Sequence, residues 1–289
     1  MKKKIILLGS KGFFGINIYN YLKKDFNIKK VHRKTNLEKI NFTNYNYLIN
    51  TAADVYHEEK MFRNNTFFVY KIIKKIVTEN KNIKLIHFGS SGEYGSSNKK
   101  LSEKHLLEPR TIYEATKSAA TMLISGYSKY YKINSIIIRP FAVYGMYENN
   151  TRIFPNFFRY FLNSQPLTIY KGFQDYVYIK DLLFFIDKII KEDLIINYGE
   201  IVNFGSGKQY SNLEIFKFCR NQFIKNYKKF PSLNYSYVNK FNKIYHKKIW
   251  CSNNYYLLKK FKFKFKFNIK KGIKDYIGTY LKNTKLSKT

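Results

Sequence analysis

Three glycines near the amino terminus constrain the fold of this chain more than any other feature. Residues 9–15 read GSKGFFG, and this turn joins a β-rich run, Lys4–Leu8, to an amphipathic run, Phe13–Leu22. The first glycine permits a tight turn, the second lets the backbone approach a pyrophosphate, and the third lets helix and strand pack closely. The order of strand, glycine turn and helix therefore predicts a dinucleotide site.

Short apolar runs alternate with helical patterns through the first half of the chain. The runs 47–49, 83–88 and 135–138 predict strands, and the periodicity at about 66–77 and 113–131 predicts helices. This alternation is typical of an α/β fold with a Rossmann-like, doubly wound parallel sheet.

After residues 139–140 the pattern is less regular, with helical pieces at 155–161 and 181–190 and a strand-like run at 201–204. We therefore expect two parts. Residues 1–145 plus about 173–205 would form the dinucleotide-binding domain, and about 146–172 plus 206–289 a smaller, C-terminal substrate-binding lobe.

The charge is extreme, at +34 with a pI near 9.9, and residues 217–289 hold a single acid, Asp275. Such a balance suggests nucleic acid, an anionic membrane surface or an acidic substrate as partner. However, Lys, Asn, Ile, Tyr and Phe are abundant together, as a biased coding composition would produce. We favour that explanation and do not expect a nucleic-acid partner.

The chain has two cysteines, Cys219 and Cys251, without a CxxC pair or a nearby histidine cluster, so neither a disulfide framework nor a metal site is expected. Three lysines before the apolar run 5–8 resemble a leader peptide, but that run is too short. No stretch approaches the roughly 18 apolar residues of a membrane span. A cytoplasmic protein without membrane contact fits best.

The segment 259–267 alternates lysine with phenylalanine. Basic residues interleaved with aromatics can bind single-stranded nucleic acid. An edge strand that covers the core with its phenylalanine face explains the same pattern, and this is the interpretation that we favour.

The turn after the expected second strand bears on the choice of cofactor. That strand should end near Val31, and His32, Arg33 and Lys34 follow it, with no carboxylate before Glu38. A carboxylate there would hold the ribose of NAD, whereas a basic residue accommodates the 2′-phosphate of NADP. We therefore favour NADP(H) over NAD(H), with Arg33 as the deciding residue, although an ordinary basic turn in a lysine-rich chain would look the same.

A tyrosine and a lysine, Tyr113 and Lys117, are four residues apart on one face of an expected helix. A free phenol has a pKa near 10, and a neighbouring ammonium and a positively charged nicotinamide would favour the phenolate. Ser90 follows the expected strand 83–88, so its hydroxyl is placed to hold a reacting oxygen.

Together these residues resemble the extended short-chain dehydrogenase/reductase family, in its NAD-dependent epimerase/dehydratase group that acts on nucleotide sugars. The resemblance runs nearly end to end, through segments 50–53 (NTAA), 139–145 (RPFAVYG), 166–170 (PLTIY), 175–181 (DYVYIKD) and 203–207 (NFGSG). It implies that Tyr113 is the acid/base, that Lys117 binds the nicotinamide ribose and lowers the tyrosine pKa, and that Ser90 holds the substrate oxygen.

The expected cofactor-binding residues are Gly9, Lys11, Gly12, Phe13, Phe14, Gly15, Arg33, Ala52, Ala53, Tyr113, Lys117 and Pro140. The expected substrate-binding residues are Ser90, Ser91, Tyr113, Arg152 and Gln174. Gln174 and Ala142 replace an arginine and an asparagine of the family pattern, so Arg152, Lys171 or the basic tail would have to supply the phosphate contacts.

Two departures from the family narrow the chemistry. Its 4,6-dehydratases carry an Asp-Glu pair directly after the serine or threonine, whereas this chain has Ser91 and Gly92, and Glu93 should point to the opposite side. Its epimerising reductases use a cysteine at the position of Gly92 and a histidine downstream, and this chain has no histidine between His105 and His246.

With dehydration and C3/C5 epimerisation disfavoured, the sequence predicts oxidation or reduction at a single carbon of the sugar. Reduction of a 4-keto nucleotide sugar with NADPH is the prediction that Arg33 favours, and 4-epimerisation with a retained NAD is the alternative. A non-catalytic cofactor-sensing or RNA-binding relative is a further alternative, but such proteins usually lose the tyrosine or lysine. In this family the helices corresponding to 66–77 and 113–131 commonly form a dimer contact, so we expect a homodimer.

Overall fold

The centre of the molecule is a sheet of six parallel strands in the order β10-β5-β4-β3-β1-β2. The structure is a computed structural model that describes residues 2–32, 35–226, 235–241 and 249–283. The strands of this sheet are β1 (Lys4–Leu8), β2 (Asn27–Val31), β3 (Tyr47–Asn50), β4 (Lys84–Phe88), β5 (Ser135–Pro140) and β10 (Glu200–Phe204). The predicted parallel sheet is therefore confirmed, and each strand predicted from an apolar run lies in it.

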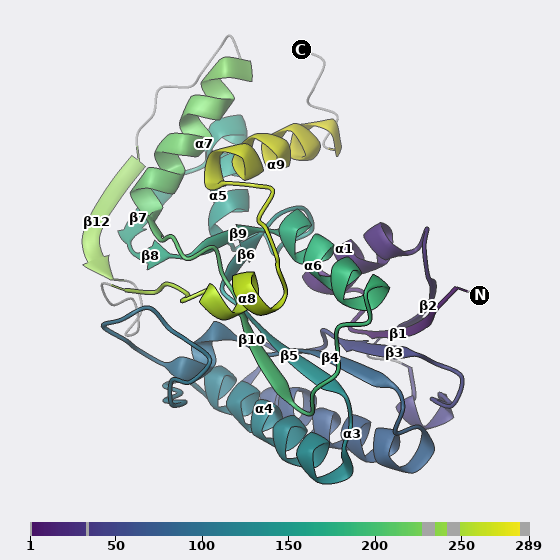
Figure 1. Ribbon diagram of the computed structural model, residues 1–289. Coiled ribbons are helices and arrows are strands. Elements are labelled where there is room, and N and C mark those ends of the chain that lie inside the picture. Colours follow the sequence, from purple (N-terminus) through teal and green to yellow (C-terminus); the bar gives the residue numbers. More distant parts are fainter. Residues whose placement is uncertain (1, 33–34, 227–234, 242–248, 284–289) are drawn as a thin grey trace.

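Helices cover both faces of the sheet, as a doubly wound fold requires (Figure 1). On one face lie α1 (Phe13–Leu22) and α6 (Ile179–Lys191). The other face is covered by α3 (Phe68–Glu79) and α4 (Ile112–Tyr131), with α2 (Glu58–Met61) and a π-helical turn (Phe62–Phe67) leading into α3. The predicted helix at 66–77 thus begins earlier, within a helical run that starts at Glu58.

The remaining elements gather beside α6, away from α3 and α4 (Figure 1). The helices of this second group are α5 (Ile153–Asn163), α7 (Asn212–Asn226) and α9 (Ile269–Asn283). The short helix α8 (Tyr255–Lys260) lies against β10. Three short strand pairs join them: β6 (Ala142–Tyr144) with β9 (Tyr176–Tyr178), β7 (Leu167–Lys171) with β12 (Tyr235–Phe241), and β8 (Phe173–Gln174) with β11 (Tyr210–Ser211). The division of the chain into two lobes stays a prediction.

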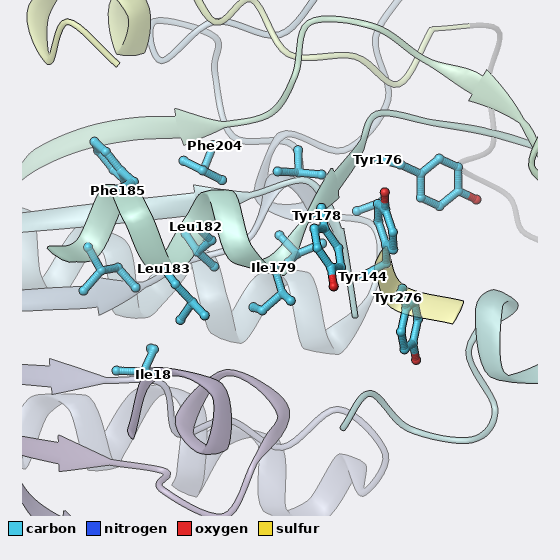
Figure 2. Close-up of a cluster of buried hydrophobic side chains, with 14 of the residues drawn as sticks. Ile18, Tyr144, Tyr176, Tyr178, Ile179, Leu182, Leu183, Phe185, Phe204 and Tyr276 are labelled. Carbon is cyan, nitrogen blue, oxygen red and sulfur yellow. The ribbon is translucent and has the colours of Figure 1, made fainter. Parts of the chain in front are cut away.

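Helix α6 links the sheet to this second group of elements. Phe185 stacks on Phe204 of β10, with 5.3 Å between the ring centroids, and the same apolar cluster includes Ile18 of α1. At the carboxyl end of β6 and β9, tyrosines from several elements continue the cluster (Figure 2). Burial of each aromatic ring in this cluster stabilises the folded state by about 1.5–3 kcal/mol. Helix α6 is therefore packed both against the sheet and against the second group of elements.

The prediction of an edge strand at 259–267 is wrong. Phe261 and Phe263 are buried and the intervening lysines are exposed, so the alternation of faces is correct, but the segment pairs with no strand in the described residues. The carboxylate of Asp181 accepts hydrogen bonds from the amides of Lys266 (2.8 Å) and Phe267 (3.2 Å). A side chain thus satisfies amides that a neighbouring strand would otherwise have bonded.

Within the described ranges no helix is both long enough and apolar enough to cross a membrane.

Candidate active site

The glycine turn joins β1 to α1, and its geometry explains each glycine. Gly9 has a φ of +79°, and a Cβ there would come within 2.7 Å of the Ala52 amide nitrogen. A Cβ at Gly15 would overlap the Gly9 carbonyl oxygen. At Gly12 the nearest atom would be 3.4 Å away, so its backbone is open to a neighbour from outside the chain. Gly12 also begins α1, where the unpaired amides attract an anion.

A cavity of about 650 Å³ opens above this turn. It is lined by Gly9, Lys11 and Gly12, and by Ala52 and Ala53 after β3, so it brings five of the predicted cofactor residues together. The end of β2 contributes as well, through its last residue and the turn that follows it. The cavity thus spans the carboxyl ends of three adjacent strands, where ligands of α/β sheets bind.

The other predicted cofactor residues that the structure describes are not among the residues of the lining. Phe13 and Phe14 are half-buried in α1 and pack on the core, with the Phe14 ring 4.8 Å from that of Phe88. Pro140 is buried at the end of β5, paired in register with Phe204. Arg33 lies outside the described residues.

Sequence reasoning missed several lining residues. They are His32, Thr35, Thr51, Lys60, Arg63, Asn64 and Phe68. The cations among them gave no usable signal because the chain has 53 lysines and arginines.

Ser90 and Tyr113 meet across the end of β4 and the first turn of α4. The Ser90 hydroxyl accepts a hydrogen bond from the Gly92 amide (3.1 Å) and is hydrogen-bonded to the Tyr113 phenol. The helix start that places Tyr113 is fixed by a capping box, in which Thr111 and Glu114 each bond the other's amide. The structure thus brings together two of the three predicted catalytic residues.

Burial raises the pKa of Tyr113 to about 12. The hydrogen bond from Ser90 and the positive charge of Arg152 oppose that rise, whereas the carboxyls of Glu93 and Glu114 add to it. The phenol therefore carries its proton at neutral pH and is prepared to act as an acid.

Lys117 is almost fully buried one turn further along α4, and its ammonium donates a hydrogen bond to the carbonyl oxygen of Phe88. Burial lowers the pKa of Lys117 to about 8, and the nearby Glu93 carboxylate opposes this. Lys117 is not among the groups that act most strongly on the Tyr113 phenol, so its pKa-lowering role stays a prediction.

The turn that follows Ser90, Ser91–Tyr94, contains one carboxylate, and it is turned inward. Glu93 is fully buried, accepts hydrogen bonds from the Ser90 amide (2.7 Å), and pairs with Arg139 (2.8 Å). Ser91 is also buried, and a Cβ at Gly92 would lie 2.9 Å from the side chain of Glu114. An acidic side chain at position 92 therefore has no room beside the cap of α4.

Two predicted substrate-binding residues, Arg152 and Gln174, lie outside the turn after Ser90. Arg152 precedes α5, its side chain is 54% exposed, and its charge acts on Tyr113. Its Nε atom lies 3.9 Å from the buried carboxylate of Glu148. Gln174 pairs with Tyr210 between β8 and β11 and is half-buried.

The two aspartates of the segment 175–181 hold the chain together. Asp175 accepts hydrogen bonds from the amides of Ser206, Gly207 and Ser252. Asp181 anchors the lysine–phenylalanine segment described above. In the described part of the chain, no group of three or more His, Cys, Asp or Glu residues is arranged to hold a metal ion.

Comparison with known proteins agrees with this arrangement. Residues 43–205, more than half of the chain, match the model of the NAD dependent epimerase/dehydratase family. The chain is 25% identical over 268 residues to the dTDP-D-glucose 4,6-dehydratase of Dictyostelium discoideum, a match that covers 74% of this chain and 61% of that protein. It is 33% identical over 95 residues to an uncharacterized UDP-glucose epimerase of Bacillus subtilis, with 32% of this chain and 30% of the other covered.

Two solved structures share the fold. The dTDP-glucose 4,6-dehydratase of Bacillus anthracis, in complex with NAD, superposes with a TM-score of 0.82 at 20% identity, over 98% of each chain. The UDP-glucuronic acid 4-epimerase of Bacillus cereus, in complex with UDP-glucuronic acid and NAD, gives 0.80 at 19% identity, over 96% of this chain and 99% of the other. The chain therefore belongs to the NAD dependent epimerase/dehydratase family.

Proposed function

We propose that this protein is an NADP(H)-dependent reductase of a 4-keto nucleotide sugar. The observation that carries the proposal is the turn Ser91–Tyr94 that follows Ser90. Its single carboxylate, Glu93, is buried against Arg139, and position 92 cannot hold an acid beside Glu114. Elimination of water needs a base at the carbon that loses its proton, and the turn Ser91–Tyr94 offers none, because Glu93 is paired with Arg139.

The cavity over the glycine turn fits a dinucleotide. Gly12 leaves the backbone accessible, α1 begins there, and Lys11 adds a positive charge. These residues would hold the pyrophosphate, while Ala52 and Ala53 would form the wall beside it. When bound, the reduced nicotinamide supplies the hydride.

The protein's own residues handle the substrate oxygen. Ser90 would hold the keto oxygen by a hydrogen bond, and Tyr113 would pass its phenolic proton to that oxygen as the carbon is reduced. A phenol whose pKa is raised to about 12 is protonated at neutral pH, so it is in the form that reduction requires. Arg152, whose charge acts on Tyr113, would contact the diphosphate of the substrate.

The test is an assay of purified protein with NADPH and 4-keto-6-deoxy nucleotide sugars. We expect NADPH to be consumed in proportion to substrate, and Tyr113→Phe to lower kcat by about 100- to 10,000-fold because it removes the acid. Tyr198→Phe, a matched change at a phenol that is 42% exposed, should keep full activity. Retained turnover in Tyr113→Phe would refute the mechanism.

The same assay separates the alternatives. A 4-epimerase would interconvert nucleotide sugars without net consumption of NADPH, since its cofactor is regenerated in each turnover. A non-catalytic relative would bind a dinucleotide and turn over none of the sugars.

We also propose that the protein is a homodimer joined through α3 and α4. A broad hollow of about 720 Å³ lies on α4, beside Thr66 of the turn that leads into α3, and is lined by uncharged residues, among them Met122 and Tyr130, which are 62% and 80% exposed. An uncharged, exposed face on so basic a chain suits a second copy better than it suits water. Light scattering at micromolar concentration should show twice the 34.7 kDa monomer mass.

A further inference from the structure

Two cations on the helical run after β3 face the cofactor cavity. Lys60 in α2 and Arg63 in the π-helical turn are three residues apart, so their side chains lie on one face of that run. Both line the cavity, together with Asn64. Across the residues that the structure describes, neither cation has an ion-pair or hydrogen-bond partner for its side chain.

The π-helical turn separates two sets of side chains. Asn65 donates a hydrogen bond to the Thr116 hydroxyl (3.1 Å), and Thr66 donates one to the Thr116 carbonyl (2.9 Å), so both face α4. Arg63 and Asn64, directly before them, face the cavity instead. A π-helical turn often marks a functional site, and here the exposed Arg63 lines the cavity while Asn65 and Thr66 anchor the run to α4.

The cavity wall lacks the group that would recognise an unmodified ribose. A carboxylate usually holds the 2′-hydroxyl of NAD, but no acidic residue is found among the described residues of the lining. Asp54, which follows Ala53, is 1% exposed and bonds the amides of Tyr56 and His57. Lys11 and the amides at the start of α1 lie beside the glycine turn, whereas Lys60 and Arg63 line the cavity from the helical run after β3, where a second anionic group could be bound.

We propose that Lys60 and Arg63 form a second anion site in this cavity, which binds the 2′-phosphate of NADP(H) and sets the preference for it over NAD(H). The inference rests on the proposed function only in that the cavity holds a dinucleotide. It assigns the preference to the helix after β3, whereas the sequence alone pointed to Arg33.

Calorimetric titration with NADPH, NADH, 2′,5′-ADP and 5′-AMP tests this assignment without any turnover. The wild-type protein should bind the two 2′-phosphorylated ligands more tightly than their partners. In the double variant Lys60→Gln/Arg63→Gln the affinity for those ligands should fall by at least about tenfold, as expected for lost charge-assisted hydrogen bonds to a phosphate. Binding of NADH and 5′-AMP should change by less than about threefold.

Two further variants complete the design. Lys74→Gln removes the same charge from an exposed position of α3 that does not line the cavity, and it should leave all four affinities unchanged. Equal thermal midpoints of the variants and the wild type establish that each is folded. Arg33→Gln reports on the alternative source of the preference.

Three outcomes would overturn the proposal: an equal loss of NADH and NADPH affinity in the double variant, a preference abolished by Arg33→Gln alone, or a wild-type protein without preference. The first would assign the two cations to the pyrophosphate. Failure to bind any dinucleotide would instead refute the proposed function, so the two failures are distinguishable.

Discussion

The buried carboxyl of Glu148 gives the most quantitative prediction. Its side chain is 3% exposed, and burial raises its pKa from 4.5 to about 8. The Tyr276 hydroxyl and the Gly145 amide bond it, and Arg152 is 3.9 Å away, but Oε1 has no hydrogen-bond partner within the described structure. The folded protein therefore retains a proton at Glu148 that the unfolded chain releases near pH 4.5.

This difference makes stability depend on pH with a definite sign. The contribution of Glu148 is fully present below the unfolded pKa and is lost as the pH rises toward the folded value of about 8. Each pH unit in that window lowers the free energy of unfolding by about 1.4 kcal/mol. Between pH 5 and pH 8 the loss amounts to about 4 kcal/mol.

Glu148→Gln removes the titration and leaves an amide oxygen for the Tyr276 hydroxyl. We expect the variant to gain about 4 kcal/mol relative to the wild type between pH 5 and pH 8. Urea unfolding followed by the fluorescence of Trp250, the single tryptophan, measures both proteins at each pH.

When Glu148→Gln is compared with the wild type at each pH, the contributions of the other titrating groups cancel. Burial also raises the pKa of Asp175 and of Asp181 to about 6, but both are present in the wild type and the variant alike. Glu59→Gln, at an exposed position of α2, should follow the wild-type curve. Parallel curves for Glu148→Gln and the wild type, within about 0.5 kcal/mol at every pH, would refute the reasoning.

Four further substitutions test the fold and the assembly. Gly15→Ala should lower the free energy of unfolding by about 2 kcal/mol or more, because its methyl group meets backbone, whereas Gly126→Ala, with nothing within 4 Å in α4, should raise it by up to about 1 kcal/mol. Asp181→Asn should lose at least one amide bond to the lysine–phenylalanine segment, so that trypsin cleaves there faster than in the wild type. Met122→Glu should convert the proposed dimer to a monomer in light scattering, and an unchanged mass would exclude α4 from the interface.

The elements that the sequence predicted are those with a local cause. The glycine turn and the apolar runs of the parallel strands are each encoded within a few residues, and they place Gly9 and Ser90 at the ends of strands. The periodicity at 113–131 likewise indicated the helix whose first turn carries Tyr113. A buried parallel strand is apolar throughout, so its position can be inferred without knowledge of its neighbours.

The tertiary structure decided what depends on distant partners. The lysine–phenylalanine segment has the alternation of an edge strand, yet Asp181, distant in sequence, takes its amides and makes strand pairing unnecessary. The inward turn of Glu93 likewise depends on Arg139 from β5. The sequence by itself thus determined a parallel α/β fold with a dinucleotide turn and a serine–tyrosine–lysine set. Only the tertiary structure showed that Lys60 and Arg63 line the cavity and that Glu93 is buried away from it. In a chain so rich in lysine, the sequence does not distinguish these side chains from others of the same kind, and long-range packing determines their positions.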